Sequence, residues 1–205
     1  MPIREASPET WRLAAQAVAG GSVVAFPTDT VYGIGCDPYC VEAINAIYLL
    51  KGRAQQKALP LLLSDPERLP QVVSALPDAA ARLGERFWPG ALTLVVPRAV
   101  GLPDELGGGS TIAVRVPAHE GLRAFIEACG GAIASTSANL SGQPDALDAG
   151  HVAGYFGESV AVIVDGGRAE GGVPSTVVDC TVEPPAILRQ GAISEAALRT
   201  ALEDV

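Results

Sequence analysis

Short aliphatic runs alternate with segments of helical periodicity along the whole chain, and this alternation limits the fold more than any other feature. Runs such as 23–26 and 92–96 look like short buried strands, whereas residues 41–50 place apolar side chains at helical spacing. Because the alternation is irregular, we expect one α/β domain over residues 1–205, built on a mixed, twisted sheet with flanking helices. Other expected strands are 59–63, 111–116, 132–135, 160–164, 176–178 and 186–188, and other helices begin after Ser7 and Ser194 or span 122–129 and 151–156.

The composition is aliphatic and acidic. Of the 205 residues, 48% are hydrophobic but only 5% are aromatic, and the formal net charge is −9 with 14 Lys and Arg. A protein held to nucleic acid mainly by phosphate neutralisation needs a basic surface, so extended nucleic-acid binding is disfavoured. A local basic pocket for a small anion remains compatible with this charge.

The cysteines and the first residues of the chain bear on its location. No two of the four cysteines form a C-x-x-C pair and the two His are not at ligand spacing, so we expect buried, reduced thiols and no metal site. Residues 1–19 lack a basic segment followed by an apolar one, and no apolar run reaches membrane-spanning length. We therefore expect a cytoplasmic protein without a signal peptide.

Nucleotide-binding proteins often carry a Gly-rich phosphate loop, and this sequence has none. It contains neither G-x-x-x-x-G-K-[ST] nor G-x-G-x-x-G. Any nucleotide site must therefore be assembled from side chains and strand ends.

The first polar stretch is Thr28-Asp29-Thr30-Val31-Tyr32-Gly33. It directly follows a buried strand, where α/β proteins tend to place ligands. If the chain stays extended, Thr28, Thr30 and Tyr32 share one face, and their hydroxyls suit a small polar ligand. The alternative is an ordinary loop with local Thr and Asp turn bonds.

Three cations follow the helix expected at 41–50. Gly52 should end this helix, so that Lys51 and Arg53 turn inward, with Lys57 four residues further on. Lys supplies a compact charge and Arg a planar fork suited to phosphate or carboxylate oxygens. The alternative is a solvated basic C-terminus that complements the helix dipole.

Two later stretches also combine hydroxyls with strand ends. In the strand 111–116, Thr111 and Arg115 share the face opposite the apolar one, as the floor of an anion site would require; a solvent-facing surface is the alternative. Residues 135–142 are too rich in hydroxyls for a core. Backbone amides and Ser hydroxyls at a strand end can cradle phosphate, although a Ser-rich turn would have the same composition.

The last polar pieces lie near the C-terminus. Ser175 precedes a strand, and Arg189 ends another. The Gly-rich segment 166–172 before Ser175 is a candidate lid.

Taken together and in this order, the segments PTDTVYG, K-G-R, T-I-A-V-R-V-P, S-A-N-L-S-G and S-T-V-V-D resemble the YrdC-like family of threonylcarbamoyl-AMP synthases, from about Glu9 to Gly191. Members combine L-threonine, bicarbonate and ATP into threonylcarbamoyl-AMP and pyrophosphate, and other enzymes then modify an adenosine of transfer RNA. The resemblance implies a nucleotidyltransferase with an open twisted sheet and a concave, basic active-site face. Within this family, the sequence resembles the short form, which lacks an extra C-terminal domain.

The resemblance also implies a role for each polar stretch. Lys51 and Arg53 would be catalytic, with Lys51 between the reacting carbamate and the phosphates, and replacing either by Ala should abolish turnover while leaving the melting temperature nearly unchanged. Threonine would be held by Thr28, Thr30, Arg115, Ser135 and Ser175. ATP would be held by Tyr32, Arg53, Lys57, Thr111, Ser137, Asn139, Asp145 and Arg189.

The sequence departs from the family pattern at three positions. Leu62 stands where many relatives carry a His that helps to hold threonine, Lys57 stands where many carry Asn, and Ala54 replaces a common Pro. The nucleophile would be the substrate's own carbamate oxygen, so the lack of a Ser-His or Cys-His pair is expected. Mg²⁺ is expected to be carried on the ATP phosphates.

Two other functions are compatible with this resemblance. A double-stranded RNA or transfer-RNA binding module could use a concave basic face, but the acidic charge argues against it. A carbamoyltransferase domain that adenylates carbamoyl phosphate is related, but such enzymes carry additional modules.

Overall fold

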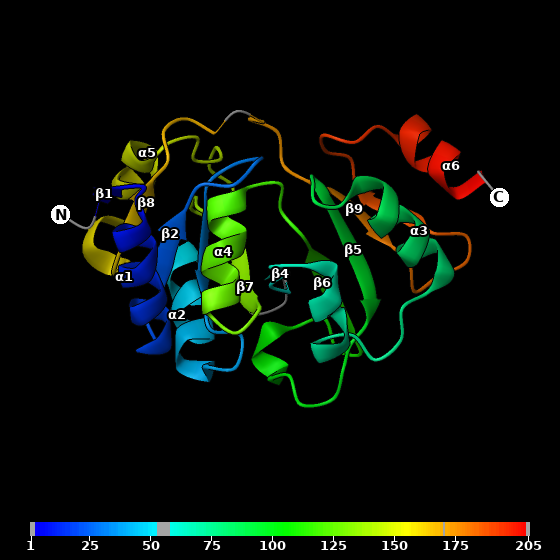
Figure 1. Cartoon of the computed structure of the whole chain (residues 1–205), viewed down its shortest axis with the longest axis horizontal. Helices are drawn as coiled ribbons and strands as arrows, with labels where there is room; N and C mark the ends of the chain where they lie inside the picture. Colours follow the sequence, from blue (N-terminus) through cyan, green and yellow to red (C-terminus); the bar gives the residue numbers. More distant parts are fainter. Residues whose placement is uncertain (1–2, 53–57, 170, 204–205) are drawn as a thin grey trace.

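A mixed β-sheet runs through the part of the chain that the computed structural model describes, which is residues 3–52, 58–169 and 171–203 (Figure 1). Within it, the strands are β1 (Ile3–Glu5), β2 (Val24–Phe26), β3 (Gly33–Cys36), β4 (Leu61–Leu63), β5 (Leu92–Pro97), β6 (Thr111–Arg115), β7 (Ala132–Ser137), β8 (Ile163–Asp165), β9 (Thr176–Asp179) and β10 (Ala186–Arg189). Their order across the sheet is β1-β8-β2-β3-β7-β4-β6-β5-β9-β10. Parallel and antiparallel pairs are both present, which confirms the expected mixed α/β sheet.

Helices cover both faces of this sheet. They are α1 (Pro8–Ala19), α2 (Val41–Lys51), α3 (Asp78–Phe87), α4 (Glu120–Ala128), α5 (Ala149–Phe156) and α6 (Glu195–Glu203), with short 3₁₀ turns at Pro66–Gln71, Asp104–Leu106 and Gly157–Ser159. Helices α1 and α4 lie side by side over β2 and β7, and α3 packs against α6 at the other end of the sheet (Figure 1). None of the helices in the described ranges has the length and apolar surface needed to span a bilayer.

The helix boundaries follow the capping residues of the sequence. Ser7 Oγ accepts a hydrogen bond of 3.1 Å from Thr10 N, and Pro8 occupies the first helical turn of α1. At the end of α2, Gly52 has a φ of 59°, a left-handed conformation that favours glycine. The prediction that Gly52 ends this helix is therefore confirmed.

Alternation along β2 separates two apolar cores. Val24 and Phe26 face the cluster formed with α1 and α4, whereas Ala25 faces the larger cluster on the other side of the sheet. The Phe26 and Phe125 rings lie 5.9 Å apart in the smaller cluster. Helices α1 and α4 therefore cover one face at the β2–β7 end of the sheet.

Two strands and several element boundaries differ from the sequence-based expectation. Strands β1 and β3 were not predicted, and the strand expected at 160–164 is β8, at 163–165. β3 contains two glycines, which usually indicate a loop. Here they give Phe26 room, since a Cβ on Gly35 would lie 3.0 Å from its ring.

All four cysteines are free thiols. Cys36 and Cys180 are buried, while Cys40 and Cys129 are partly buried. The expectation of burial holds fully for two of them.

Candidate active site

The register of the sheet brings the predicted polar stretches onto one face. Gly33 pairs with Ser137 between β3 and β7, and Leu62 pairs with Arg115 between β4 and β6. Since paired residues in neighbouring strands point to the same face, Ser137 and Arg115 lie on the face that α1 and α4 cover further along. The stretches are therefore adjacent in space although they are far apart in sequence.

A cavity of about 390 Å³ opens on this face. Its lining includes most of the predicted site residues, together with apolar positions and two further hydroxyls: that of Thr136, within the 135–142 stretch, and that of Thr93, which the sequence analysis did not single out. The predicted residues that line it are Thr28, Thr30, Tyr32, Arg115, Ser135, Ser137, Asp145, Ser175 and Arg189, and the others are Val31, Gly33, Ala58, Pro60, Leu62, Thr93, Ala113, Thr136, Pro174 and Val177.

Residues 28–31 are not extended, so the expected alternation along this stretch is wrong. Thr28 and Thr30 nevertheless line the cavity together with Tyr32, because a turn brings the two Thr hydroxyls to 2.9 Å from each other. Thr28 Oγ1 also donates to Val31 O at 2.7 Å and accepts from Thr30 N. The local turn bonds and the site are therefore both present.

Arg115 is the buried cation at the centre of the site. Only 6% of the residue is exposed. Its Nη2 donates to Asp29 Oδ1 at 2.7 Å, its Nη1 to Thr30 Oγ1 at 3.0 Å and its Nε to Gly90 O at 2.9 Å. Burial lowers the pKa of Arg115, the Asp29 carboxylate opposes this shift, and the charge of Arg189 adds to it. The guanidinium stays charged at neutral pH because an unperturbed Arg has a pKa above 12.

Arg189 and Ser175 form a second polar group in the cavity lining. The Arg189 guanidinium donates to Ser175 O at 2.9 and 3.1 Å and to Ser175 Oγ at 3.1 Å. Partial burial lowers the pKa of Arg189, and Asp145 opposes that shift. Gly191 permits this arrangement, since a Cβ there would lie 2.3 Å from Pro174 O. The structure thus places Arg189, assigned to ATP from the sequence, against a residue assigned to threonine.

Lys51 lies behind the turn that follows β7. It is 3% exposed, and its Nζ donates to Ser137 O at 2.5 Å, to Asn139 O at 2.8 Å and to Asn139 Oδ1 at 3.1 Å. Ser137 Oγ donates to the same Asn139 Oδ1 at 2.6 Å. Within the described ranges, Lys51 and Asn139 do not line the cavity. Their contacts shape the turn that begins at Ser137, and Ser137 does line the cavity.

The other predicted phosphate contacts are less central. Thr111 donates to Gly108 O at 2.9 Å and does not line the cavity in the described part of the chain. Arg53 and Lys57 lie outside the described residues.

Tyr32 ties the candidate lid to the first polar stretch. Its hydroxyl donates to Gly167 O at 2.6 Å and accepts from Gly166 N at 3.1 Å, and burial raises its pKa to about 12. Gly172 N also donates to Thr30 O at 2.8 Å. The described residues at both ends of segment 166–172 are therefore hydrogen-bonded to residues that line the cavity.

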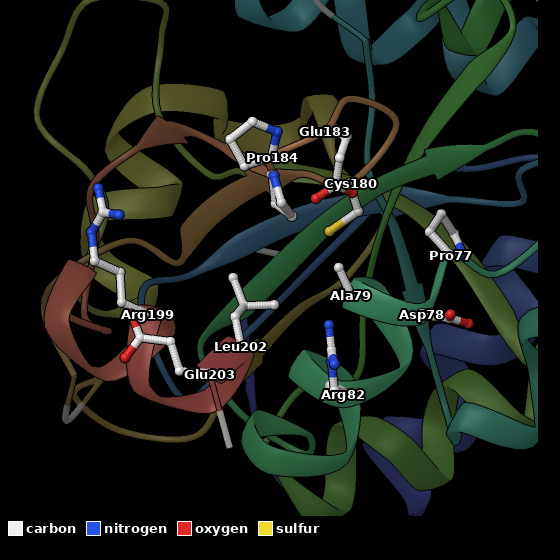
Figure 2. A pocket seen from close by; sticks show the side chains of 11 residues that line it. Pro77, Asp78, Ala79, Arg82, Cys180, Glu183, Pro184, Arg199, Leu202 and Glu203 are labelled. Carbon is white, nitrogen blue, oxygen red and sulfur yellow. The ribbon is translucent and has the colours of Figure 1, made fainter. Parts of the chain in front are cut away.

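A second cavity, of about 460 Å³, lies between α3, α6 and the segment after β9 (Figure 2). Arg82 and Arg199 reach it together with Asp78, Glu183 and Glu203, so its charges are mixed (Figure 2). Burial raises the pKa of Cys180 in its wall to about 12, so this thiol stays protonated. None of the residues predicted to hold substrate lines this cavity.

Chemically, the first cavity combines two guanidinium groups, the Asp145 carboxylate and a set of hydroxyls, and the Asp29 carboxylate is bonded to Arg115. Such a set suits a small zwitterion beside a phosphate-bearing ligand. Thr93 is the hydroxyl that sequence reasoning missed. Its signal was a polar residue between Leu92 and Leu94, which in an alternating strand points away from the core.

Comparison with known proteins agrees with this geometry. A family model described as "Telomere recombination" (Sua5/YciO/YrdC) matches residues 16–191. A threonylcarbamoyl-AMP synthase of Pyrococcus abyssi is 42% identical over 188 residues, covering 90% of this chain and 55% of that protein. One of Idiomarina loihiensis is 39% identical over 177 residues, covering 83% of this chain and 93% of that protein. The chain therefore spans about half the length of the Pyrococcus relative and nearly all of the Idiomarina one.

Among solved structures, Sua5 of P. abyssi complexed with L-threonine has a TM-score of 0.93 and 38% identity, and the match covers 99% of this chain and 61% of that chain. The fold and the resemblance derived from the polar stretches are thereby confirmed. The chain belongs to the Sua5/YciO/YrdC family.

Proposed function

We propose that this chain forms threonylcarbamoyl-AMP from L-threonine, bicarbonate and ATP, with release of pyrophosphate and water. The observation that carries the proposal is the buried Arg115, held by Asp29 and Thr30 in a cavity that continues to the Ser135–Ser137 strand end. Relatives named threonylcarbamoyl-AMP synthase, and a related structure with bound L-threonine, support it.

The reaction requires positioning rather than a protein nucleophile. The threonine amine and bicarbonate form a carbamate with loss of water; a carbamate oxygen then bonds to the α-phosphorus, and the α–β phosphoanhydride bond breaks to release pyrophosphate. Both reacting groups are anions, so cationic side chains and oriented hydroxyls lower their repulsion, and enclosure supplies proximity. Arg115 and Arg189 are suited to hold the amino acid, and Ser137 is suited to contact a phosphate.

Divalent metal would enter with the nucleotide. Among the described residues there is no group of three or more His, Cys, Asp or Glu able to hold a metal ion. Mg²⁺ usually keeps several waters and binds through substrate phosphates, so MgATP is the expected form of the nucleotide. We further propose a cytoplasmic location and transfer of the product to transfer-RNA threonylcarbamoyl-transfer enzymes.

The proposed reaction predicts that pyrophosphate release requires every substrate. We expect release from MgATP when threonine and bicarbonate are both present, and background release when either is omitted, because the attacking group is their joint product. Release is measured with a coupled pyrophosphate assay in bicarbonate-depleted buffer. Release without bicarbonate would contradict carbamate formation, and release with carbamoyl phosphate in place of both would favour the carbamoyltransferase alternative.

A further inference from the structure

Thr93, on β5, is a buried hydroxyl in the cavity that no role yet explains. It is 5% exposed, and its Oγ1 lies 2.8 Å from Ser175 Oγ, which is also 5% exposed. Thr93 lies on β5, and Ser175 directly precedes the neighbouring strand β9, in which Val177 pairs with Thr93. A buried threonine hydroxyl on a cavity wall costs free energy unless it is hydrogen-bonded, so its partner matters.

The Thr93–Ser175 pair offers one hydrogen to the cavity. Two hydroxyls carry two hydrogens, and one of these is used in the bond between them. Arg189 Nη2 donates to Ser175 Oγ, which occupies a lone pair and no hydrogen. In the described part of the chain neither hydroxyl has another acceptor, so the second hydrogen is left for a ligand, whichever of the two donates to the other.

The Thr28–Thr30 pair, in the same cavity lining, has the opposite polarity. Thr28 Oγ1 donates its hydrogen to Val31 O, so the bond between the two threonines is a donation from Thr30 to Thr28. Thr30 Oγ1 also accepts from Arg115 Nη1. Its hydrogen is therefore used, and one lone pair remains for an N–H of the ligand.

The charges near Ser175 indicate which ligand group meets the donor. The Arg189 guanidinium contacts Ser175 and makes no salt bridge in the described part of the chain, whereas the charge of Arg115, which donates to Thr30, is paired with Asp29. The unpaired positive charge therefore lies at the Ser175 end of the site. A carboxylate is the group of an amino acid that such an end would bind. Donation from Arg189 also polarises the Ser175 hydroxyl, which makes it the better donor of the pair.

We propose that Thr93 is a positioning residue that donates to Ser175 and thereby directs the Ser175 hydroxyl at the carboxylate of the amino-acid substrate, while Thr30 accepts from its nitrogen. This inference rests on the proposed function and deepens it. It fixes the direction of the substrate in the cavity, with the nitrogen on the Thr30 side and the carboxylate on the Ser175 side. The nitrogen, which becomes the carbamate, is then held by an acceptor that does not compete for its reacting lone pair.

The test compares Thr93→Val, which removes the hydroxyl at nearly equal size, with Thr93→Ser, which keeps it. We expect Thr93→Val to raise the Kd for L-threonine, measured by calorimetry without ATP, by about tenfold, the scale of one hydrogen bond to a charged group. In turnover, the KM for threonine should rise similarly, with kcat and the KM for ATP within about twofold of the parent values. Thr93→Ser should stay within about twofold of the parent throughout.

A double-mutant cycle separates positioning from a general structural effect. In a Ser175→Ala background, Thr93→Val should change the Kd by less than about twofold, because the group it directs is gone. The same tenfold loss in both backgrounds, or equal losses for Thr93→Ser and Thr93→Val, would overturn the proposal. If Thr93→Val does not fold, Thr93→Cys, a small and weak donor, takes its place.

α-Aminobutyrate, which keeps the carboxylate but lacks the side-chain hydroxyl, tests the ligand group. Thr93→Val should weaken its binding, measured by competition, by the same factor; a loss seen with threonine alone would overturn the carboxylate assignment. If the parent protein binds threonine without turnover, the proposed function is refuted, and the Kd values of the variants still test this inference. A parent that does not bind threonine would refute both.

Discussion

Replacement of Arg115 by methionine is expected to abolish measurable threonine binding and to lower the free energy of unfolding by about 3–5 kcal/mol, as found when one partner of a buried ion pair is removed. Arg115 holds Asp29 at 2.7 Å, and both side chains are largely shielded from water. Without the guanidinium, Asp29 lies uncompensated beside Thr30, and the Gly90 carbonyl loses a donor. Chemical denaturation and threonine calorimetry measure the two effects.

Two variants separate charge from geometry at this pair. Arg115→Lys keeps the charge but cannot reach Asp29, Thr30 and Gly90 at once, so binding should remain weak while part of the stability returns. A double variant with Asp29→Asn should recover stability without recovering threonine binding. If Arg115→Met binds threonine as well as the parent protein, Arg115 supports the fold and does not hold the substrate.

Replacement of Lys51 by methionine is expected to lower pyrophosphate release by about 10²–10³-fold and the free energy of unfolding by about 2–4 kcal/mol. The ammonium group donates to the Ser137 and Asn139 carbonyl oxygens, and its loss removes these donors from buried acceptors. The sequence-based expectation of an unchanged melting temperature is revised by these contacts.

Asn139→Ala is the matched variant for this prediction, because it disturbs the same turn from the other side. It should reproduce both losses in smaller measure, and combining it with Lys51→Met should give less than the sum. Rates come from the pyrophosphate assay and stabilities from urea unfolding. Lost turnover with full stability in Lys51→Met would instead favour direct contact between Lys51 and the reacting groups.

Sequence pattern predicted the elements whose residues carry their own signals. The alternation in 111–116 put Ile112 and Val114 in the core and Arg115 on the opposite face, and Ser7 and Gly52 marked helix ends. β3 was missed because its glycines satisfy a requirement set by Phe26, a residue of another strand. Such a requirement is tertiary and leaves no local pattern.

The sequence predicted most of the residues that line the cavity, but it did not predict which of them contact one another. Which hydroxyls meet depends on strand register, such as Gly33 opposite Ser137, which local sequence does not specify. For the same reason the sequence could not show that Lys51 holds the turn after β7. Arg189 likewise proved to contact Ser175, because β9 and β10 are neighbours.

The central claim, that this chain activates a threonine carbamate with ATP, is tested most directly by following isotopically labelled bicarbonate. Protein, MgATP, L-threonine and the labelled bicarbonate are mixed, and the nucleotide products are separated and analysed by mass spectrometry. We predict one new product that contains the label, threonine and AMP in equal amounts and forms in step with pyrophosphate. ATP cleavage without label in an AMP-containing product would contradict the account.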